Sequence, residues 1–142
     1  MLIDKNNLPL VAVEFMNQVH LEDVELINEL YDLILQVHKQ PIPENTAKLN
    51  EKYSQWFEHT INHFQKEEEK MLQLHFPPYP RHKGEHDRAL ALMDTLYRQW
   101  IDLNDINILK DYFEKDLVPW LVQHIQTMDT ITAMFFKNSH SH

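Results

Sequence analysis

The residues with the most distinctive chemistry in this chain are histidines, several of which stand at helical spacing from one another or from a carboxylate. Histidine accounts for 10 of the 142 residues. His63 precedes Glu67 by four positions, and the same interval separates His82 from His86. Residues four apart on an α-helix differ by about 40° around its axis and project in nearly the same direction. Each pair therefore presents two potential ligands to one metal ion.

Three further residues of ligand type, His20, His124 and Asp129, are predicted to lie with these pairs on the inner faces of their helices. Burying imidazoles and carboxylates costs free energy unless they are paired, hydrogen-bonded or bound to metal. Five imidazoles with two carboxylates suit iron, zinc, copper or nickel, and suit calcium or magnesium poorly. Seven ligands also exceed the four of a tetrahedral zinc site. The pattern therefore predicts two metal ions that share bridging carboxylates.

Long segments with apolar residues three and four apart must position these side chains. This spacing is helical periodicity rather than the alternation of a strand. Prolines, which lack the backbone N–H and restrict the preceding residue, separate the first three segments. The predicted helices cover residues 17–39, 45–75, 80–102 and 106–136.

Short connections between consecutive helices favour antiparallel neighbours. The predicted fold is therefore all-α: an up-down-up-down antiparallel four-helix bundle with an N-terminal arm. Residues 1–142 are expected to form a single domain, with the arm at 1–16, the bundle at about 17–136 and a frayed tail at 137–142.

Composition excludes several classes of function. The formal net charge is −9, which speaks against a nucleic-acid-binding surface and against anionic membranes. The absence of cysteine excludes disulfides, thiolate metal sites and cysteine nucleophiles, and a single glycine leaves no phosphate-binding glycine loop. The first residues do not resemble a signal peptide, and no run of 18 apolar residues could span a membrane. We therefore expect a soluble, cytoplasmic protein.

The last predicted helix contains two irregularities. Pro119 lies in its interior, where it indicates either a break between two shorter helices or a kink near a site. Asp129 follows His124 by five residues, about 140° around an ideal helix, so that regular geometry does not place both side chains on one face. We therefore predict that this helix is kinked or contains a π-bulge that redirects Asp129.

These residues together resemble the hemerythrin family, specifically its single-domain bacterial members. The resemblance covers about residues 8–135 and keeps the family's motif order. The matching motifs are His63-Phe64-Gln65-Lys66-Glu67-Glu68, His82-Lys83-Gly84-Glu85-His86 and the segment from Trp120 through His124 to Asp129, preceded by the isolated His20.

The resemblance implies a role for each residue. One iron would be held by His82, His86 and His124. The other would be held by His20 and His63 and would keep an open position for O2. Two carboxylates would bridge the ions together with an oxo or hydroxo group, and the matching residues are Glu67 and Asp129. The cofactor implied is thus a pair of iron ions, in the Fe²⁺ or Fe³⁺ state.

The function implied is O2 carriage, storage or delivery rather than enzymatic catalysis, because the ligand shell carries few charges and no proton donor or substrate groove was predicted. Alternatives are an O2, redox or iron sensor acting on a separate, unidentified partner, and a di-iron oxidase or enzyme reactive toward peroxide or nitric oxide. His59 is either a hydrogen-bond partner of the ligands or an ordinary half-buried histidine. Glu68 and Glu69 are expected to be solvated. The side chains expected around the open position are Val24, Phe64, Trp120, Leu121 and Ile125.

Overall fold

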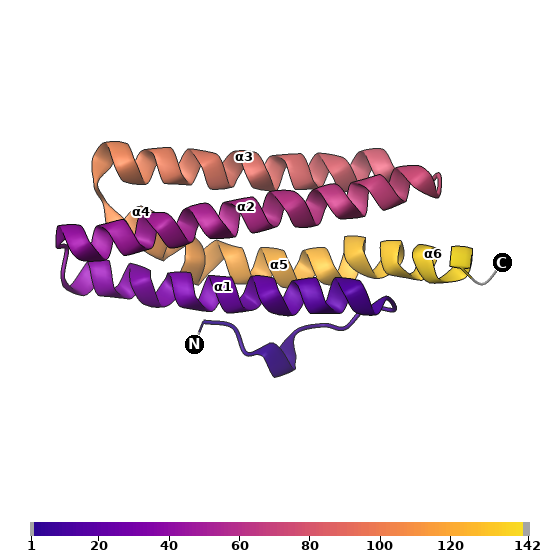
Figure 1. The fold of residues 1–142 in the computed structure, drawn as a ribbon, viewed down its shortest axis with the longest axis horizontal. Coiled ribbons are helices and arrows are strands. Elements are labelled where there is room, and N and C mark those ends of the chain that lie inside the picture. The colour runs from indigo at the N-terminus through magenta and orange to yellow at the C-terminus, as the bar shows by residue number, and fades with distance from the viewer. Residues whose placement is uncertain (1, 141–142) are drawn as a thin grey trace.

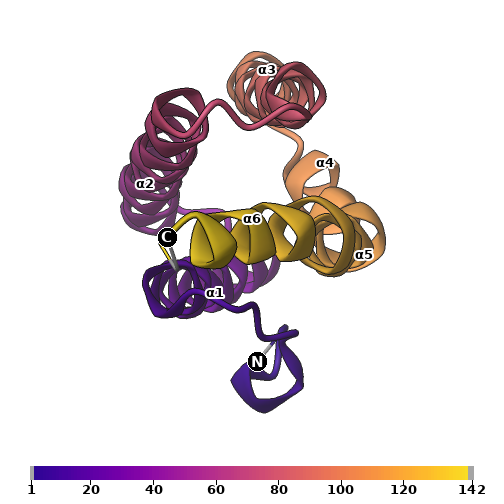
Figure 2. The same cartoon turned by 90° about the vertical axis from the view of Figure 1, so that its right-hand side faces the viewer.

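The computed structural model describes residues 2–140, and these form helices and the segments that join them. Three long helices, α1 (Glu14–Lys39), α2 (Pro43–Gln73) and α3 (Tyr79–Leu103), run antiparallel in turn (Figure 1). The fourth helix of the bundle is made up of consecutive helical segments, which the end-on view places beside the other three helices (Figure 2). The predicted four-helix bundle is therefore confirmed. The α-helical segments of the fourth helix are α4 (Ile106–Asp111), α5 (Val118–His124) and α6 (Thr130–His140).

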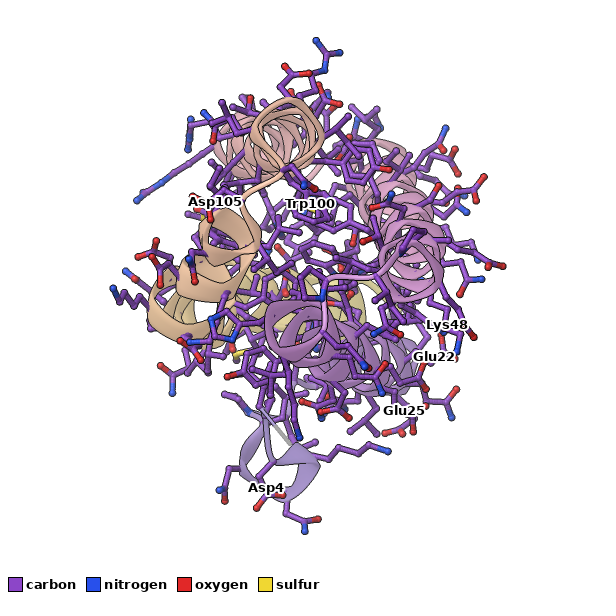
Figure 3. The ribbon with its side chains drawn as sticks, turned by 90° about the vertical axis from the view of Figure 1, so that its left-hand side faces the viewer. Asp4, Glu22, Glu25, Lys48, Trp100 and Asp105 are labelled. Carbon is purple, nitrogen blue, oxygen red and sulfur yellow. The ribbon has the colours of Figure 1, made fainter. Side chains whose placement is uncertain are left out.

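The helix ends follow from local chemistry. Pro43 occupies the first turn of α2, where its missing N–H has no intrahelical partner to lose. Asn104 ends α3 in the left-handed conformation (φ 49°), which asparagine tolerates better than most residues. Asp105 then caps α4, accepting a hydrogen bond from the backbone N–H of Asn107 at 3.0 Å. Figure 3 shows Asp105 at this end of the bundle, close to the buried Trp100.

The N-terminal arm is held along α1 by two asparagine side chains. Asn28 accepts a hydrogen bond from the backbone N–H of Ile3 (2.8 Å) and donates one to its carbonyl (2.9 Å). Asn17 makes the same pair of bonds to Val11, at 2.8 and 2.9 Å. Between them the arm forms one short 3₁₀ turn, η1 (Lys5–Asn7). The arm ends earlier than predicted, because α1 begins at Glu14.

The fourth helix differs from an ideal helix in two places. Two π-helical stretches, η2 (Tyr112–Leu117) and η3 (Ile125–Asp129), interrupt the α-helical pattern. The predicted widening is therefore confirmed, and the chain remains helical through Pro119, which lies in the first turn of α5 directly after η2. Residues 137–140 continue α6 instead of fraying as predicted, and residues 141–142 of the predicted tail lie outside the described residues.

The apolar core consists of two clusters that lie at different levels along the bundle. The larger includes Val24, Trp56 and Ile125, and the smaller is built on Met16, Met71 and Phe136. His20, His63, Glu67 and Asp129 fall between these levels in sequence, and His124 lies directly before Ile125. The bundle thus carries a polar layer between two apolar ones. None of the helices within residues 2–140 combines the length and apolar character needed to cross a bilayer.

Candidate metal centre

The structure brings all seven predicted residues together inside the bundle. The first group comes from α3 and the fourth helix, and the second from α1 and α2. Within each group every residue offers one ligand atom within 4.8 Å of the others. The first group is His82, His86, His124 and Asp129, and the second is His20, His63 and Glu67.

Each of the two carboxylates reaches both groups. Asp129 places Oδ2 3.0 Å from Nε2 of His20, whereas its Oδ1 lies 3.2 Å from Nε2 of both His82 and His124. The two oxygens of one carboxylate therefore point to different groups of imidazoles. This is the geometry required of a bridging ligand.

Glu67 has the same divided arrangement on the opposite side. Its Oε2 contacts Nε2 of His63, one turn earlier on α2. Its Oε1 lies 3.6 Å from Nε2 of His82 and 3.7 Å from Nε2 of His86. Glu67 and Asp129 are each 1% exposed, so that water cannot replace these contacts.

The outer nitrogens of the three-histidine group each face an oxygen acceptor. Nδ1 of His82 lies 2.8 Å from the Thr132 hydroxyl, and Nδ1 of His86 lies 2.9 Å from Glu68. An outer partner of this kind fixes the ring orientation and directs the other nitrogen at the metal. The sequence prediction that Glu68 is solvated is therefore wrong: its carboxylate reaches across from α2 to α3.

The third outer partner is Glu85, whose Oε1 lies 2.6 Å from Nδ1 of His124. By contrast, Nδ1 of His20 is buried without a hydrogen-bond partner. Sequence reasoning identified none of the three outer partners, although Glu85 follows His82 by three residues and Thr132 follows Asp129 by three, which are helical intervals. The two groups therefore differ in how firmly their imidazoles are oriented.

The inward-facing atoms show whether these residues fit a metal. Nε2 of His82, His86 and His124 is buried in each case and has no hydrogen-bond partner. Oε1 of Glu67 and Oδ1 of Asp129 are equally buried and make no hydrogen bond within residues 2–140. Buried polar atoms without partners cost free energy, and a cation at their common focus removes that cost. The residues therefore fit a pair of metal ions.

The protonation equilibria of the cluster are strongly perturbed. Burial lowers the pKa of His86 to about 2, and the adjacent His82 and His124 act in the same direction. Burial also opposes the charged form of His124, but the carboxylates of Asp129 and Glu85 outweigh it and raise its pKa to about 10. Burial raises the pKa of Glu67 well above its usual range. His86 is thus ready to ligate, whereas His124 must first release a proton.

The π-helical turn η3 explains how Asp129 joins His124 despite their five-residue spacing. A π turn closes i→i+5 hydrogen bonds and adds one residue to the turn, so that residues five apart share a face. Thr130 donates its hydroxyl to the carbonyl of Ile125 at 2.7 Å, which satisfies a backbone group within this widened stretch. Asp129 is consequently within reach of both His20 and His124.

A small cavity of about 30 Å³ lies beside His20 and His63. Phe64, Trp120 and Leu121 line it, as the sequence predicts. Val24 and Ile125 were also expected there, but neither lines it; both are fully buried in the larger apolar cluster. Asp23, which sequence reasoning missed, takes the place expected for Val24. The signal was its position three residues after His20 on the inner face of α1.

His59 makes no hydrogen bond to any of the seven clustered residues within the described part of the chain. Its ring centroid lies 6.4 Å from that of His63, and its buried Nε2 has no partner. His59 is half-buried and does not line the cavity. The interpretation of His59 as an ordinary half-buried histidine therefore fits better than that of a hydrogen-bond partner of the ligands.

The fold and this site define a class: helical bundle proteins with a histidine-rich dinuclear metal centre in the core. Comparison with known proteins assigns the chain to one family. The family model described as the hemerythrin HHE cation binding domain matches residues 11–135. The chain belongs to the hemerythrin family. Hemerythrin domains hold a di-iron centre, and the buried cluster of histidines and carboxylates fits it.

Named relatives agree with this assignment. The chain is 30% identical to the bacteriohemerythrin of Aquifex aeolicus (strain VF5), over 94% of this chain and 96% of the relative. It is 23% identical to the bacteriohemerythrin of Methylococcus capsulatus (strain Bath), over 84% and 89%. It is 32% identical to the myohemerythrin of Sipunculus nudus, over 74% and 84%. No solved structure gave a significant match.

Proposed function

We propose that this chain is a non-haem di-iron protein that binds O2 reversibly and serves to carry, store or deliver it. The observation that supports the proposal most directly is the division of each carboxylate between two groups of imidazoles. It supports the following assignment of ligands. His82, His86 and His124 would hold one iron, His20 and His63 would hold the other, and Glu67 and Asp129 would bridge them.

The two metal positions have different numbers of protein ligands. Three imidazoles and Asp129 form the first group, whereas two imidazoles and Glu67 form the second, and each carboxylate also reaches the other group. The cavity of about 30 Å³ has His20 and His63 of the second group in its wall, together with His124 and Asp129 of the first. When bound, the iron pair would supply the electrons that O2 binding requires, and the protein supplies a small cavity that adjoins residues of both groups.

The size of this space favours a binding protein over an oxidase that acts on organic substrates. A cavity of about 30 Å³ suits a diatomic molecule or one to two waters. Phe64, Leu121 and Trp120 close it with apolar surface. These apolar side chains narrow the access to the cavity.

The proposal is tested by metal content and an optical spectrum on protein reduced without air and then exposed to it. We expect two irons per chain, a colourless reduced form, and a visible band that appears with O2 and disappears when O2 is removed. Immediate irreversible oxidation would contradict reversible binding. Zinc, or little metal of any kind, would contradict the di-iron centre.

A matched pair of variants tests the ligand assignment. His63 and His59 lie one turn apart on α2, but only His63 contacts a bridging carboxylate. His63→Ala should lower the iron content from two to about one, whereas His59→Ala should keep two. Equal losses in both variants, with helicity checked by circular dichroism, would refute the assignment.

A further inference from the structure

The cavity beside His20 and His63 contains a carboxyl group that the proposed metal site does not use. Asp23 lies on α1 three residues after His20 and is only 8% exposed. Its Oδ1 is buried without a hydrogen-bond partner, although the side chain lines the cavity. Asp23 is not among the residues whose ligand atoms converge within 4.8 Å. A buried carboxylate oxygen without a hydrogen bond is unfavourable, so that a molecule able to donate a hydrogen bond to it would be stabilised there.

A second unpartnered polar group lines the same cavity. Nε1 of Trp56 is buried and makes no hydrogen bond of normal geometry within residues 2–140, although the indole N–H is near enough to the Asp23 carboxyl to act on it as a donor and favour its ionised form. An indole N–H only donates, whereas a carboxylate oxygen accepts. A molecule in the cavity that contacts both side chains therefore finds one donor and one acceptor. The imidazoles of His63, His59 and His20 also face the Asp23 carboxyl.

The volume of the cavity suits a molecule about the size of water. A water needs roughly 10–15 Å³ and two to four polar partners. The cavity offers about 30 Å³, and its remaining wall is largely apolar, with Phe64, Met93 and Leu121 among its residues. Purely apolar cavities stay dry, whereas one that contains unpartnered polar atoms attracts water.

We propose that Asp23 and Trp56 form a binding site for one small hydrogen-bonding molecule, which is water when no other ligand is present. Asp23 thereby acts as a specificity-determining residue of the cavity. Small molecules with O–H or N–H groups, such as hydrogen peroxide or hydroxylamine, are favoured because they replace the water's hydrogen bonds. O2 is disfavoured because it displaces an ordered water without offering a donor to the carboxylate. Only this last consequence rests on the proposed function.

The first test is crystallographic and uses the full chain as purified, at a resolution that shows ordered water. We expect a water within hydrogen-bond distance of Asp23 Oδ1 in the wild type. It should persist in Asp23→Asn, whose amide also forms hydrogen bonds, and disappear in Asp23→Leu. A dry cavity in the wild type, or a direct Trp56–Asp23 hydrogen bond that leaves no room for water, would overturn the proposal.

The second test is thermal stability at matched metal content, with Asn17→Leu as the control. Asn17 is also a buried polar residue of α1, but both its hydrogen bonds are made, to Val11. Asp23→Leu should raise the melting temperature because it removes an unpartnered group, whereas Asn17→Leu should lower it. If the melting temperature falls by a similar amount in both variants, Asp23 has a structural role, and the proposal that it binds a small molecule is overturned.

The third test is O2 affinity of the iron-loaded protein. Asp23→Leu should bind O2 about tenfold more tightly than the wild type, and Asp23→Asn should stay near the wild type. Unchanged affinity in Asp23→Leu would overturn the specificity role. Failure of the wild type to bind iron or O2 would refute the proposed function. The crystallographic test would still show whether Asp23 and Trp56 form a binding site for a small molecule.

Discussion

Replacing Glu85 tests whether the outer partners of the histidines control the metal site. Glu85 accepts the hydrogen bond of His124 Nδ1 at 2.6 Å and is 21% exposed, so that the contact is partly shielded from solvent. Hydrogen bonds to charged groups contribute about 1.5–3 kcal/mol, roughly twice the value of neutral ones. Glu85→Gln keeps an acceptor but loses the charge, whereas Glu85→Ala loses both.

The expected loss in affinity follows from these values. Removing about half of the interaction in Glu85→Gln should weaken binding of one metal ion about tenfold, since about 1.4 kcal/mol corresponds to a factor of ten. Glu85→Ala should weaken it up to about a hundredfold, the upper end for loss of such a partner. The second ion, beside His20 and His63, should be affected less because Glu85 does not contact these residues.

The assay is an anaerobic titration with Fe²⁺ in competition with a chelator, which resolves the two binding steps. Glu69→Gln is the matched control because it removes the same charge from an exposed position on α2. If Glu85→Gln binds both ions as tightly as Glu69→Gln, the reasoning that outer partners orient the ligands is wrong. An equal loss of both ions would show that Glu85 acts through the fold as a whole.

Three further outcomes are expected. Gly84→Ala should raise the melting temperature of the metal-free protein and its free energy of unfolding, the latter by up to about 1 kcal/mol. The reason is that Gly84 lies inside α3 and an added Cβ meets only Arg88, at 3.6 Å. A lower melting temperature in calorimetry would contradict this. Asn50→Leu should lower the free energy of unfolding, measured by chemical denaturation, by about 1 kcal/mol. The substitution removes the oxygen that accepts a hydrogen bond from the buried Trp100 N–H at 2.9 Å. An unchanged denaturation midpoint would show that water replaces this acceptor. Metal affinity should rise with pH from about 6 to 9. The pKa of His124 is raised to about 10, so that this imidazole must lose a proton before it can bind metal. A metal affinity that does not change with pH, measured by competition with a chelator, would contradict this expectation.

The sequence alone indicated the chemistry, because ligand type and helical spacing are local properties. His63 with Glu67, and His82 with His86, needed only the 3.6-residue period to be placed on one face. The helices themselves followed from apolar spacing and from prolines such as Pro43, which stands where a helix begins. Even the widened turn at η3 was predictable, since five residues between His124 and Asp129 do not fit a regular helix.

The outer partners could not be predicted because their contacts join different helices. Glu68 lies beside Glu67 in sequence and reads as a solvated residue of α2, yet its carboxylate meets His86 on α3. Glu85 likewise reaches from α3 to His124 on the fourth helix. Periodicity tells which way a side chain points from its own axis, but not the rotation and crossing angle of the neighbouring helix that receives it.

The same limit applies to the wall of the cavity. Val24 and Asp23 both lie near His20 on α1, at four and three residues, and helical spacing allows either to face the metal. The apolar residue was the natural expectation, because burying a carboxyl is costly. Packing decided otherwise: Val24 fills the larger apolar cluster, and Asp23 turns to the cavity. The sequence thus determined which residues can bind metal and on which helices they lie. Only the tertiary structure decided which side chains line the cavity, since that depends on how four helices fit together.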